Sequence, residues 1–219
     1  MMKGNKMKAL QPPDTFWDKR SKNYDKRYKK KNYSLYKKTI DGVRSLLTNS
    51  DLVLDFACGT GEISLDIAPH VQKVLGIDIS KKMIALANKK VRERQIDNAS
   101  FSQIDAFDQR LESNSFSAIL AFHVFHLVDD APKVLTRLND LLAPGGLLIS
   151  QTPCFGEKGW LFRSMISLAQ KLGLAPPIRR LRIPELESLV SSTNFEIFET
   201  KIQYEKYSVQ WIVARKVKK

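Results

Sequence analysis

The sequence predicts an α/β protein with a doubly wound parallel sheet and helices on both faces. Short apolar runs that suit buried strands alternate with segments in which apolar residues recur at helical spacing. A glycine-containing loop follows the first apolar run, and the next two runs each end on an acidic residue. Ligands of such sheets bind beyond the carboxyl ends of the strands, where the strand order reverses. We therefore expect the functional site at that edge.

The chain has the size and composition of one globular domain. Its 219 residues, 43% of them hydrophobic, suffice for a full core. No apolar run approaches the roughly 18 residues that span a bilayer, and the start, MMKGNKMKAL, lacks the apolar region of an export signal. Two cysteines, Cys58 and Cys154, make no disulfide framework. We expect a single cytoplasmic domain over residues 1–219.

The net charge of +13 is concentrated at the two ends. Residues 1–50 hold 14 basic and 4 acidic residues, residues 201–219 hold 6 and 1, and the middle is close to neutral. Basic ends can contact an anionic membrane surface or a nucleic acid, and they can equally be solvated tails that aid solubility. Nucleic acid is the less favoured partner, and the sequence leaves the oligomeric state open.

The N-terminal segment is expected to hold a disordered start, residues 1–13, and then helices over residues 14–48. Asp14 or Thr15 can cap the first helix. Its aromatic residues are Phe16, Trp17, Tyr24 and Tyr28. Apolar residues then continue at helical spacing at Leu35, Ile40, Val43 and Leu47.

Leu52–Glu62, LVLDFACGTGE, predicts a strand, a tight loop and the start of a helix. Gly59 and Gly61 allow the loop backbone to take positive φ and approach a ligand, towards which the first helical turn presents its N–H groups. A loop of this kind also serves dinucleotide enzymes. Asp55 favours a different ligand, because a carboxylate at the strand end repels a pyrophosphate and attracts a sulfonium or ammonium group.

The alternation of strands and helices continues after this loop. Val74–Asp78 is expected to be a second strand, with Asp78 placed to accept hydrogen bonds from both hydroxyls of a ribose, and Ser80 is expected to cap the helix that follows. Phe101–Asp105 is expected to be a third strand and Phe116–Phe122 a fourth.

The fifth strand follows one more helix. Asp129 or Asp130 is expected to cap that helix, and Pro144-Gly145-Gly146 to end it and open the strand GLLIS. After Gln151 the pattern loosens. Residues 155–182 hold an apolar stretch, Trp160 to Leu172, and a basic cluster of Arg179, Arg180 and Arg182. We expect them to form a substrate-side insertion over the open side of the site, with burial in the domain or in a dimer interface as the alternative.

Four motifs, LDFACGTGE, GIDIS, QIDAF and LLAPGGLLIS, resemble the class I S-adenosylmethionine (SAM)-dependent methyltransferases, specifically the small-molecule group that includes the ubiquinone- and menaquinone-biosynthesis enzymes. The resemblance is close over roughly residues 53–151. It implies a Rossmann-like seven-stranded sheet with a SAM-binding core at residues 51–151. The C-terminal part, residues 183–219, is expected to form a helix from Pro184 and an antiparallel β-hairpin that completes the sheet. Its two strands are expected at Phe195–Tyr204 and Tyr207–Arg215, the second alternating apolar and polar residues.

The resemblance also implies roles for residues of the cofactor site. Asp55 is expected to hold the methionine ammonium, Asp78 the ribose, and Asp105 the adenine amino group together with the Ala106 N–H. Tyr24-Asp25 matches the aromatic-Asp pair of the family's lid helix, which brings Tyr24 or Tyr28 near the methionine end. The backbone that faces this end is expected at Ala57, Cys58, Gly59 and Gly61. The apolar contacts to the cofactor are expected from Ile79 and Met83, which flank the adenine, and from Phe122. As ordinary core residues, Ile79 and Met83 would look the same.

His123 and His126 follow the fourth strand, where the transferred methyl group would sit. His126 matches a position where many relatives carry a histidine. An unperturbed pKa near 6.5 would let either residue take a proton from an acidic acceptor. Packing or positioning is the favoured interpretation of both. The three histidines and two cysteines show no metal-ligand spacing, so no metal is expected.

The sequence therefore predicts a SAM-dependent methyltransferase that acts on a small, lipophilic or aromatic acceptor by in-line displacement. Because the sulfonium methyl of SAM is already activated, the protein must mainly align the reacting atoms. Three alternatives remain. An RNA methyltransferase would use the basic ends, and a SAM-binding or partner-binding protein without turnover would carry the same motifs. A nicotinamide dehydrogenase is favoured by Gly59-x-Gly61 and opposed by Asp55.

Overall fold

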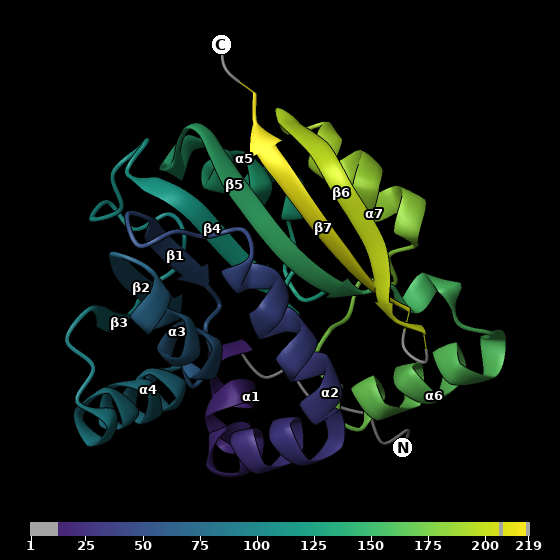
Figure 1. The fold of residues 1–219 in the computed structure, drawn as a ribbon. Coiled ribbons are helices and arrows are strands. Elements are labelled where there is room, and N and C mark those ends of the chain that lie inside the picture. Colours follow the sequence, from purple (N-terminus) through teal and green to yellow (C-terminus); the bar gives the residue numbers. More distant parts are fainter. Residues whose placement is uncertain (1–12, 206–207, 218–219) are drawn as a thin grey trace.

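The computed structural model of the chain contains one seven-stranded sheet with helices on both faces (Figure 1). It describes residues 13–205 and 208–217, without the side chains of residues 13, 23 and 26–32. The strands are β1 (Leu52–Phe56), β2 (Lys73–Asp78), β3 (Ala99–Gln103), β4 (Phe116–Phe122), β5 (Leu142–Pro153), β6 (Phe195–Tyr204) and β7 (Val209–Lys216). The helices are α1 (Pro13–Arg20), α2 (Tyr24–Arg44), α3 (Glu62–Ile67), α4 (Lys81–Arg94), α5 (Ala131–Leu141), α6 (Trp160–Lys171) and α7 (Ile183–Ser191). The predicted fold class is confirmed.

The strand order is β3-β2-β1-β4-β5-β7-β6, and β7 runs antiparallel to both of its neighbours, β5 and β6. The chain moves outward from β1 through β2 to β3, and then returns to the other side of β1 with β4. The strand order therefore reverses between β1 and β4. In a doubly wound sheet this is where the helices diverge and leave room for a ligand.

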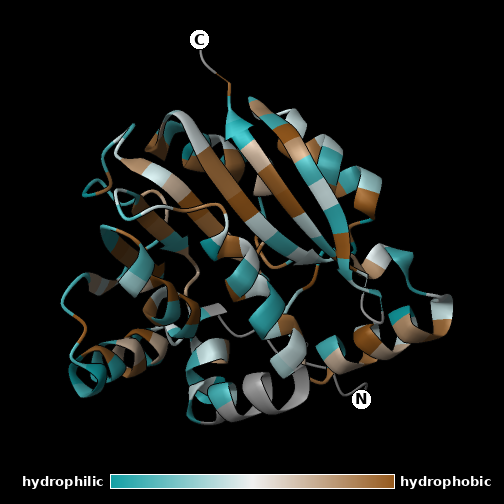
Figure 2. Cartoon of the chain, viewed as in Figure 1, coloured by the Kyte–Doolittle hydropathy of each residue, from teal (hydrophilic) through white to brown (hydrophobic). Residues whose placement is uncertain are grey.

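Two hydrophobic clusters, one on each face of the sheet, hold the helices in place. On one face α2, α3 and α4 pack through residues such as Val43, Ile67 and Ala87. On the other face α5 and α7 pack through residues such as Leu135 and Leu186. The strands between them show mainly hydrophobic colours in Figure 2, as strands covered on both faces do. No helix in the described part of the chain combines the length and apolar character needed to span a bilayer.

The N-terminal helices differ from the prediction. The first helix begins at Pro13, before the predicted caps Asp14 and Thr15, and Asp14 instead accepts the N–H of Thr15 inside the first turn. A 3₁₀ turn at Ser21–Asn23 separates α1 from α2, which then runs without a break to Arg44. Phe16 of α1 and Tyr36 of α2 are both buried, and Tyr36 belongs to the hydrophobic cluster that α2 forms with the sheet. The predicted disorder of residues 1–13 lies, apart from Pro13, outside the described residues.

Some strand boundaries also differ from the prediction. β3 ends at Gln103, two residues before Asp105, and β5 begins at Leu142, with a register shift beside β4 near Phe116. Gly146 lies within β5, where a Cβ atom would come within 2.9 Å of the Ala143 carbonyl. The predicted alternation of apolar and polar residues in β7 does not produce a solvent-exposed face of the strand. Residues 209–214 are all buried, because β5 and β6 flank this strand and helices cover both of its faces.

Candidate functional site

A cavity of about 250 Å³ lies at the carboxyl ends of β1, β2 and β4, where the strand order reverses. The start of α4 and the segment after β3 complete its wall, and α1 and α2 add Trp17 and Tyr24. The predicted site residues that line this cavity are Ala57, Gly59, Asp78, Ile79, Met83, Asp105, Ala106, Phe122 and His123. Residues far apart in the sequence are thus brought together at the predicted edge.

A smaller cavity of about 50 Å³ adjoins the first one. Both cavities are lined by Tyr24, Ala57, Phe122 and His123. The lining of the smaller cavity also contains the predicted residues Asp55 and Cys58. Two further acids line it, Asp25 of α2 and Glu62 of α3. It therefore presents three carboxyl groups beside a ligand that lies in the larger cavity.

Asp78 ties the glycine loop to the end of β2. Its carboxylate accepts the N–H of Gly59 at 2.9 Å and the N–H of Ser80 at 2.8 Å. Burial raises the pKa of Asp78, although these two hydrogen bonds oppose the shift. Ser80 caps α4 as predicted, since its hydroxyl accepts the N–H of Met83. One carboxylate therefore fixes both the loop and the helix start at the cavity.

Asp55 lies at the end of β1 with only 3% of its surface exposed. Its carboxylate accepts a hydrogen bond from the Ser64 hydroxyl. Burial raises the pKa of Asp55 to about 7, in spite of this hydrogen bond, and the nearby Asp78 adds to the shift. A cation in the smaller cavity would favour the ionised form of this carboxyl group.

Positive φ angles shape the glycine loop, as predicted. Ala57, Gly59 and Gly61 have φ of 59°, 56° and 74°. Gly61 caps α3 and lies outside the linings of both cavities, and a Cβ atom there would come within 2.6 Å of the Phe101 ring. Gly61 is therefore required by packing between the loop and β3.

The segment after β3 forms the far wall of the cavity. The exposed carboxylate of Asp105 accepts the N–H of Phe107 at 2.8 Å, which leaves carboxylate lone pairs for a ligand. Ala106 is buried, and its carbonyl accepts the Nε–H of Arg137 at 3.0 Å. The same guanidinium donates to the carbonyl of Leu111 at 2.7 Å. Arg137 of α5 thus holds this wall in place.

The two histidines occupy different surroundings. His123, with φ of 54°, lines both cavities, and burial lowers its pKa to about 4. His126 lies behind the wall of the cavity, where its ring packs edge-on against Phe155 at 5.6 Å between centroids, and burial lowers its pKa to about 3. At neutral pH both rings are therefore neutral, and only His123 faces the space where a ligand would lie.

Residues 53–146 match the methyltransferase domain family. Over 103 residues the chain is 33% identical to an uncharacterized methyltransferase of Schizosaccharomyces pombe, covering 44% of this chain and 36% of that protein. Over 100 residues it is 31% identical to the demethylmenaquinone methyltransferase of Lactococcus lactis, covering 44% and 40%. Residues 53–146 therefore carry the sequence of a methyltransferase domain.

The fold agrees with this assignment. A chain in the complex between the Haloferax volcanii Trm112 methyltransferase activator and a methyltransferase superposes with a TM-score of 0.77 at 15% identity, covering 94% of this chain and 100% of that one. The two curated relatives are matched over less than half of their own length. The predicted resemblance to SAM-dependent methyltransferases is confirmed over residues 53–146, and SAM is the cofactor of such enzymes.

The N-terminal helices close one side of the methyltransferase domain's cavity. Tyr24 lies above Gly59, with a ring carbon 3.6 Å from where a Cβ atom would stand there. Burial raises the pKa of Tyr24 to about 12, and Asp78 and Asp25 add to the shift. Asp18 of α1 accepts hydrogen bonds from the Ser80 hydroxyl at 2.6 Å and the Lys82 N–H at 3.0 Å, which fixes α1 on the start of α4. The side chain of Tyr28, also predicted at this site, lies outside the described residues.

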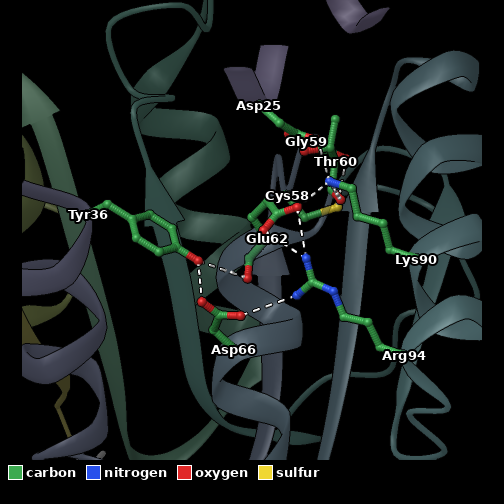
Figure 3. Close-up of polar contacts among 9 residues, drawn as sticks. All are labelled: Asp25, Tyr36, Cys58, Gly59, Thr60, Glu62, Asp66, Lys90 and Arg94. Carbon is green, nitrogen blue, oxygen red and sulfur yellow. Dashed lines mark hydrogen bonds and ion pairs between the residues drawn. The ribbon is translucent and has the colours of Figure 1, made fainter. Parts of the chain in front are cut away.

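Lys90 of α4 joins this N-terminal cover to the glycine loop (Figure 3). Its ammonium lies 2.6 Å from the carboxylate of Asp25 and 2.6 Å from that of Glu62. It also donates to the Thr60 carbonyl at 3.1 Å, while the Thr60 hydroxyl donates to Asp25. One partly buried cation therefore connects α2, α4 and the loop.

A second layer of charges supports this arrangement. Arg94 pairs with Glu62 at 3.0 Å and with Asp66 at 3.2 Å, and the Tyr36 hydroxyl donates to Asp66 at 2.5 Å (Figure 3). These contacts link α2, α3 and α4 behind the glycine loop. They lie outside the cavities apart from Glu62 and hold the loop from the far side.

The sequence did not identify several wall residues of the methyltransferase domain's cavity. They are Trp17, Phe56, Ile77, Ile104, Phe107, Val124, Leu127, Val128 and Val134. Five of them, Ile104, Phe107, Val124, Leu127 and Val128, lie in the segments that follow β3 and β4, so position after these strands was an available signal. The lining of the larger cavity contains no residue of α6 among those described, and the expected cover by residues 155–182 stays a prediction. Within the described part of the chain, no three potential metal ligands of the His, Cys, Asp and Glu types cluster.

Proposed function

We propose that the protein transfers the methyl group of SAM to a small, lipophilic or aromatic acceptor that binds beside His123. The observation that carries this proposal is the set of carboxylates around one cavity at the ends of β1 and β2 and after β3. Asp55, Asp78 and Asp105 stand at the acidic, central and far parts of the joined cavities. SAM carries a cationic methionine end, a ribose and an adenine in the same order along one molecule.

The chain's own residues would bind and orient the donor. Asp78 would take the ribose hydroxyls, Asp55 the ammonium and Asp105 with Ala106 the adenine. The glycine loop, with Ala57, Cys58 and Gly59, would face the methionine end. Ile79, Met83 and Phe122 would supply apolar contacts. When bound, SAM supplies a methyl group that needs no further activation, so the protein mainly aligns it with the acceptor.

The acceptor's chemical class is supported by the apolar surface around His123. Val124, Leu127 and Val128 line the cavity beside this histidine. The neutral ring can accept a hydrogen bond from a hydroxyl group and orient it. Because burial lowers the pKa of His123 to about 4, we propose orientation rather than proton removal as its role. The name of the Lactococcus lactis relative, which specifies demethylmenaquinone, supports an acceptor of this kind.

The test is to incubate the full chain with methyl-labelled SAM and a fractionated cell extract. We expect label to enter the fraction soluble in organic solvent. Label in RNA would replace the proposal with RNA methylation, and SAM binding without label transfer would replace it with a binding role. A competition assay with NADH covers the dehydrogenase alternative. NADH should not displace SAM, because Asp55 at the end of β1 repels a pyrophosphate.

A further inference from the structure

Helix α6 presents an apolar stripe to solvent. Leu161, Met165, Leu168 and Leu172, here called the α6 stripe, recur at the spacing of one helix face and are 59–67% exposed. Trp160 and Leu174 flank the stripe and are also exposed. In Figure 1 α6 lies apart from the sheet, beyond the ends of β6 and β7. A contiguous exposed apolar surface of this kind marks an interaction site more often than a free surface.

The opposite face of α6 is fixed to the domain. Ile166 is buried, and the Phe162 ring stacks on Phe155 at 5.9 Å between centroids. Gln170 donates to the Pro176 carbonyl at 2.9 Å, and Arg180 donates to the Ser167 hydroxyl. These contacts set the rotation of the helix, so the stripe points outward because its other face is already used.

Every charged residue in the segment that contains the stripe is basic. Residues 158–184 contain six basic residues and no acidic one. The basic residues are Lys158, Arg163, Lys171, Arg179, Arg180 and Arg182, and four of them, Lys171, Arg179, Arg180 and Arg182, are exposed. A second copy of this chain would bring the same charges face to face, which disfavours a symmetric dimer across the stripe. RNA would match the charges and leave the leucines exposed.

We propose that the α6 stripe inserts at the headgroup level of an anionic lipid bilayer, with the surrounding cations on lipid phosphates. A bilayer is the partner that buries the apolar side chains and pairs the cations in one surface. The inference rests on the proposed function for its purpose, since a lipophilic acceptor resides in a bilayer. Binding to lipid itself requires no turnover, so the two can fail separately.

The test is co-sedimentation of the full chain with phosphatidylcholine vesicles, with and without phosphatidylglycerol. We expect binding only to the vesicles that contain phosphatidylglycerol. Raising the salt concentration from 0.1 M to 1 M should weaken it, because the screening length falls from about 10 Å to about 3 Å. The fluorescence of Trp160 should shift to shorter wavelength on binding. Sedimentation only with RNA, or equal binding to neutral vesicles, would overturn the proposal.

Two variants separate the stripe from general hydrophobicity. The triple variant Leu161→Gln, Met165→Gln, Leu168→Gln changes exposed side chains and should fold normally, yet bind vesicles at least about tenfold more weakly. The matched control Phe198→Gln, Ile202→Gln alters exposed apolar residues of β6 and should leave vesicle binding unchanged. Equal losses in both variants would contradict the assignment.

A charge pair gives the second comparison. Lys171 lies beside the stripe, and Arg92 lies on the exposed surface of α4. Lys171→Glu and Arg92→Glu lower the net charge by the same amount, because each replaces a cation with an anion. Only Lys171→Glu should weaken vesicle binding several-fold. SAM affinity without lipid should stay unchanged in every variant of this series. If it stayed unchanged and vesicle binding did too, the membrane surface would be refuted while the proposed function stood.

Discussion

A single substitution at Asp78 tests the proposed ribose site. Its carboxylate already organises the site by accepting the N–H groups of Gly59 and Ser80. In Asp78→Ala both groups lose their acceptor and the proposed ribose contacts disappear. Hydrogen bonds to a charged group contribute about 1.5 to 3 kcal/mol each, so SAM affinity should fall about tenfold or more. Titration calorimetry measures this change.

Asp108→Ala is the matched control for this substitution. Asp108 lies on the surface and pairs with Arg110 at 2.8 Å, away from both cavities. Its loss should leave SAM affinity unchanged. Comparable affinities for the two variants would refute the proposed ribose site at the end of β2.

Several site residues could be predicted individually because strand ends carry a strong sequence signal. Asp55, Asp78 and the glycine loop follow apolar runs, and the topology of a parallel sheet brings such ends to one edge. His126 illustrates what this signal lacks. It lies three positions after His123, and whether a side chain in that turn faces the cavity or Phe155 depends on the local backbone, where His123 takes a positive φ.

At the scale of elements, the structure points to Lys90 as the residue that keeps the N-terminal cover on the glycine loop. In Lys90→Met the carboxylates of Asp25 and Glu62 lose a partner that lies 2.6 Å from each. The Lys90 and Glu62 side chains are only 13% and 11% exposed, so solvent screens their charges incompletely. Losing these ion pairs should therefore cost more free energy than losing a surface pair, about 1 to 3 kcal/mol. SAM affinity should fall by up to about a hundredfold.

Lys89 offers a control one position earlier on the same helix. It pairs with Glu93 at 3.5 Å, and both side chains are more than half exposed. Lys89→Met should change SAM affinity by less than about twofold. Lys90→Arg should restore part of the affinity, since a guanidinium can pair with the same acids. If Lys89→Met and Lys90→Met weakened SAM binding equally, Lys90 would have no specific role in holding the cover.

The elements of the core and the C-terminal hairpin could be predicted almost completely, while the break between the N-terminal helices could not. β1, β2 and β4 are buried runs whose composition determines their state, and β4 was predicted to the residue. The break between α1 and α2 left no mark in the sequence, because Ser21–Asn23 is also compatible with a continuous helix. The 3₁₀ turn results from tertiary contacts, such as that of Asp18 with Ser80.

At the scale of the whole molecule, the stability of the fold and the demands of the site oppose each other at Asp55. An ordinary aspartate has a pKa near 3.8, and burial raises that of Asp55 to about 7 in the folded chain. The folded state therefore keeps a proton that the unfolded chain has already lost. This contribution to stability is fully present below pH 3.8 and is lost as the pH rises to about 7. His123 and His126 act oppositely, since burial lowers their pKa values and stability is lost as the pH falls below 6.5.

Asp55→Asn should therefore stabilise the ligand-free protein at the pH where the enzyme is expected to work. The amide cannot ionise, so the advantage of the variant in free energy of unfolding should grow by roughly 1.4 kcal/mol per pH unit between pH 5 and pH 7 and then level off. Urea denaturation at several pH values measures it, and the histidine effects cancel in the comparison. Ser64→Ala removes the hydrogen bond that favours the carboxylate and should move the levelling point to higher pH. The same Asp55→Asn variant should bind SAM more weakly, because the ammonium loses its counter-charge. A variant that gained no stability with rising pH would show that Asp55 is ionised in the folded chain without a ligand.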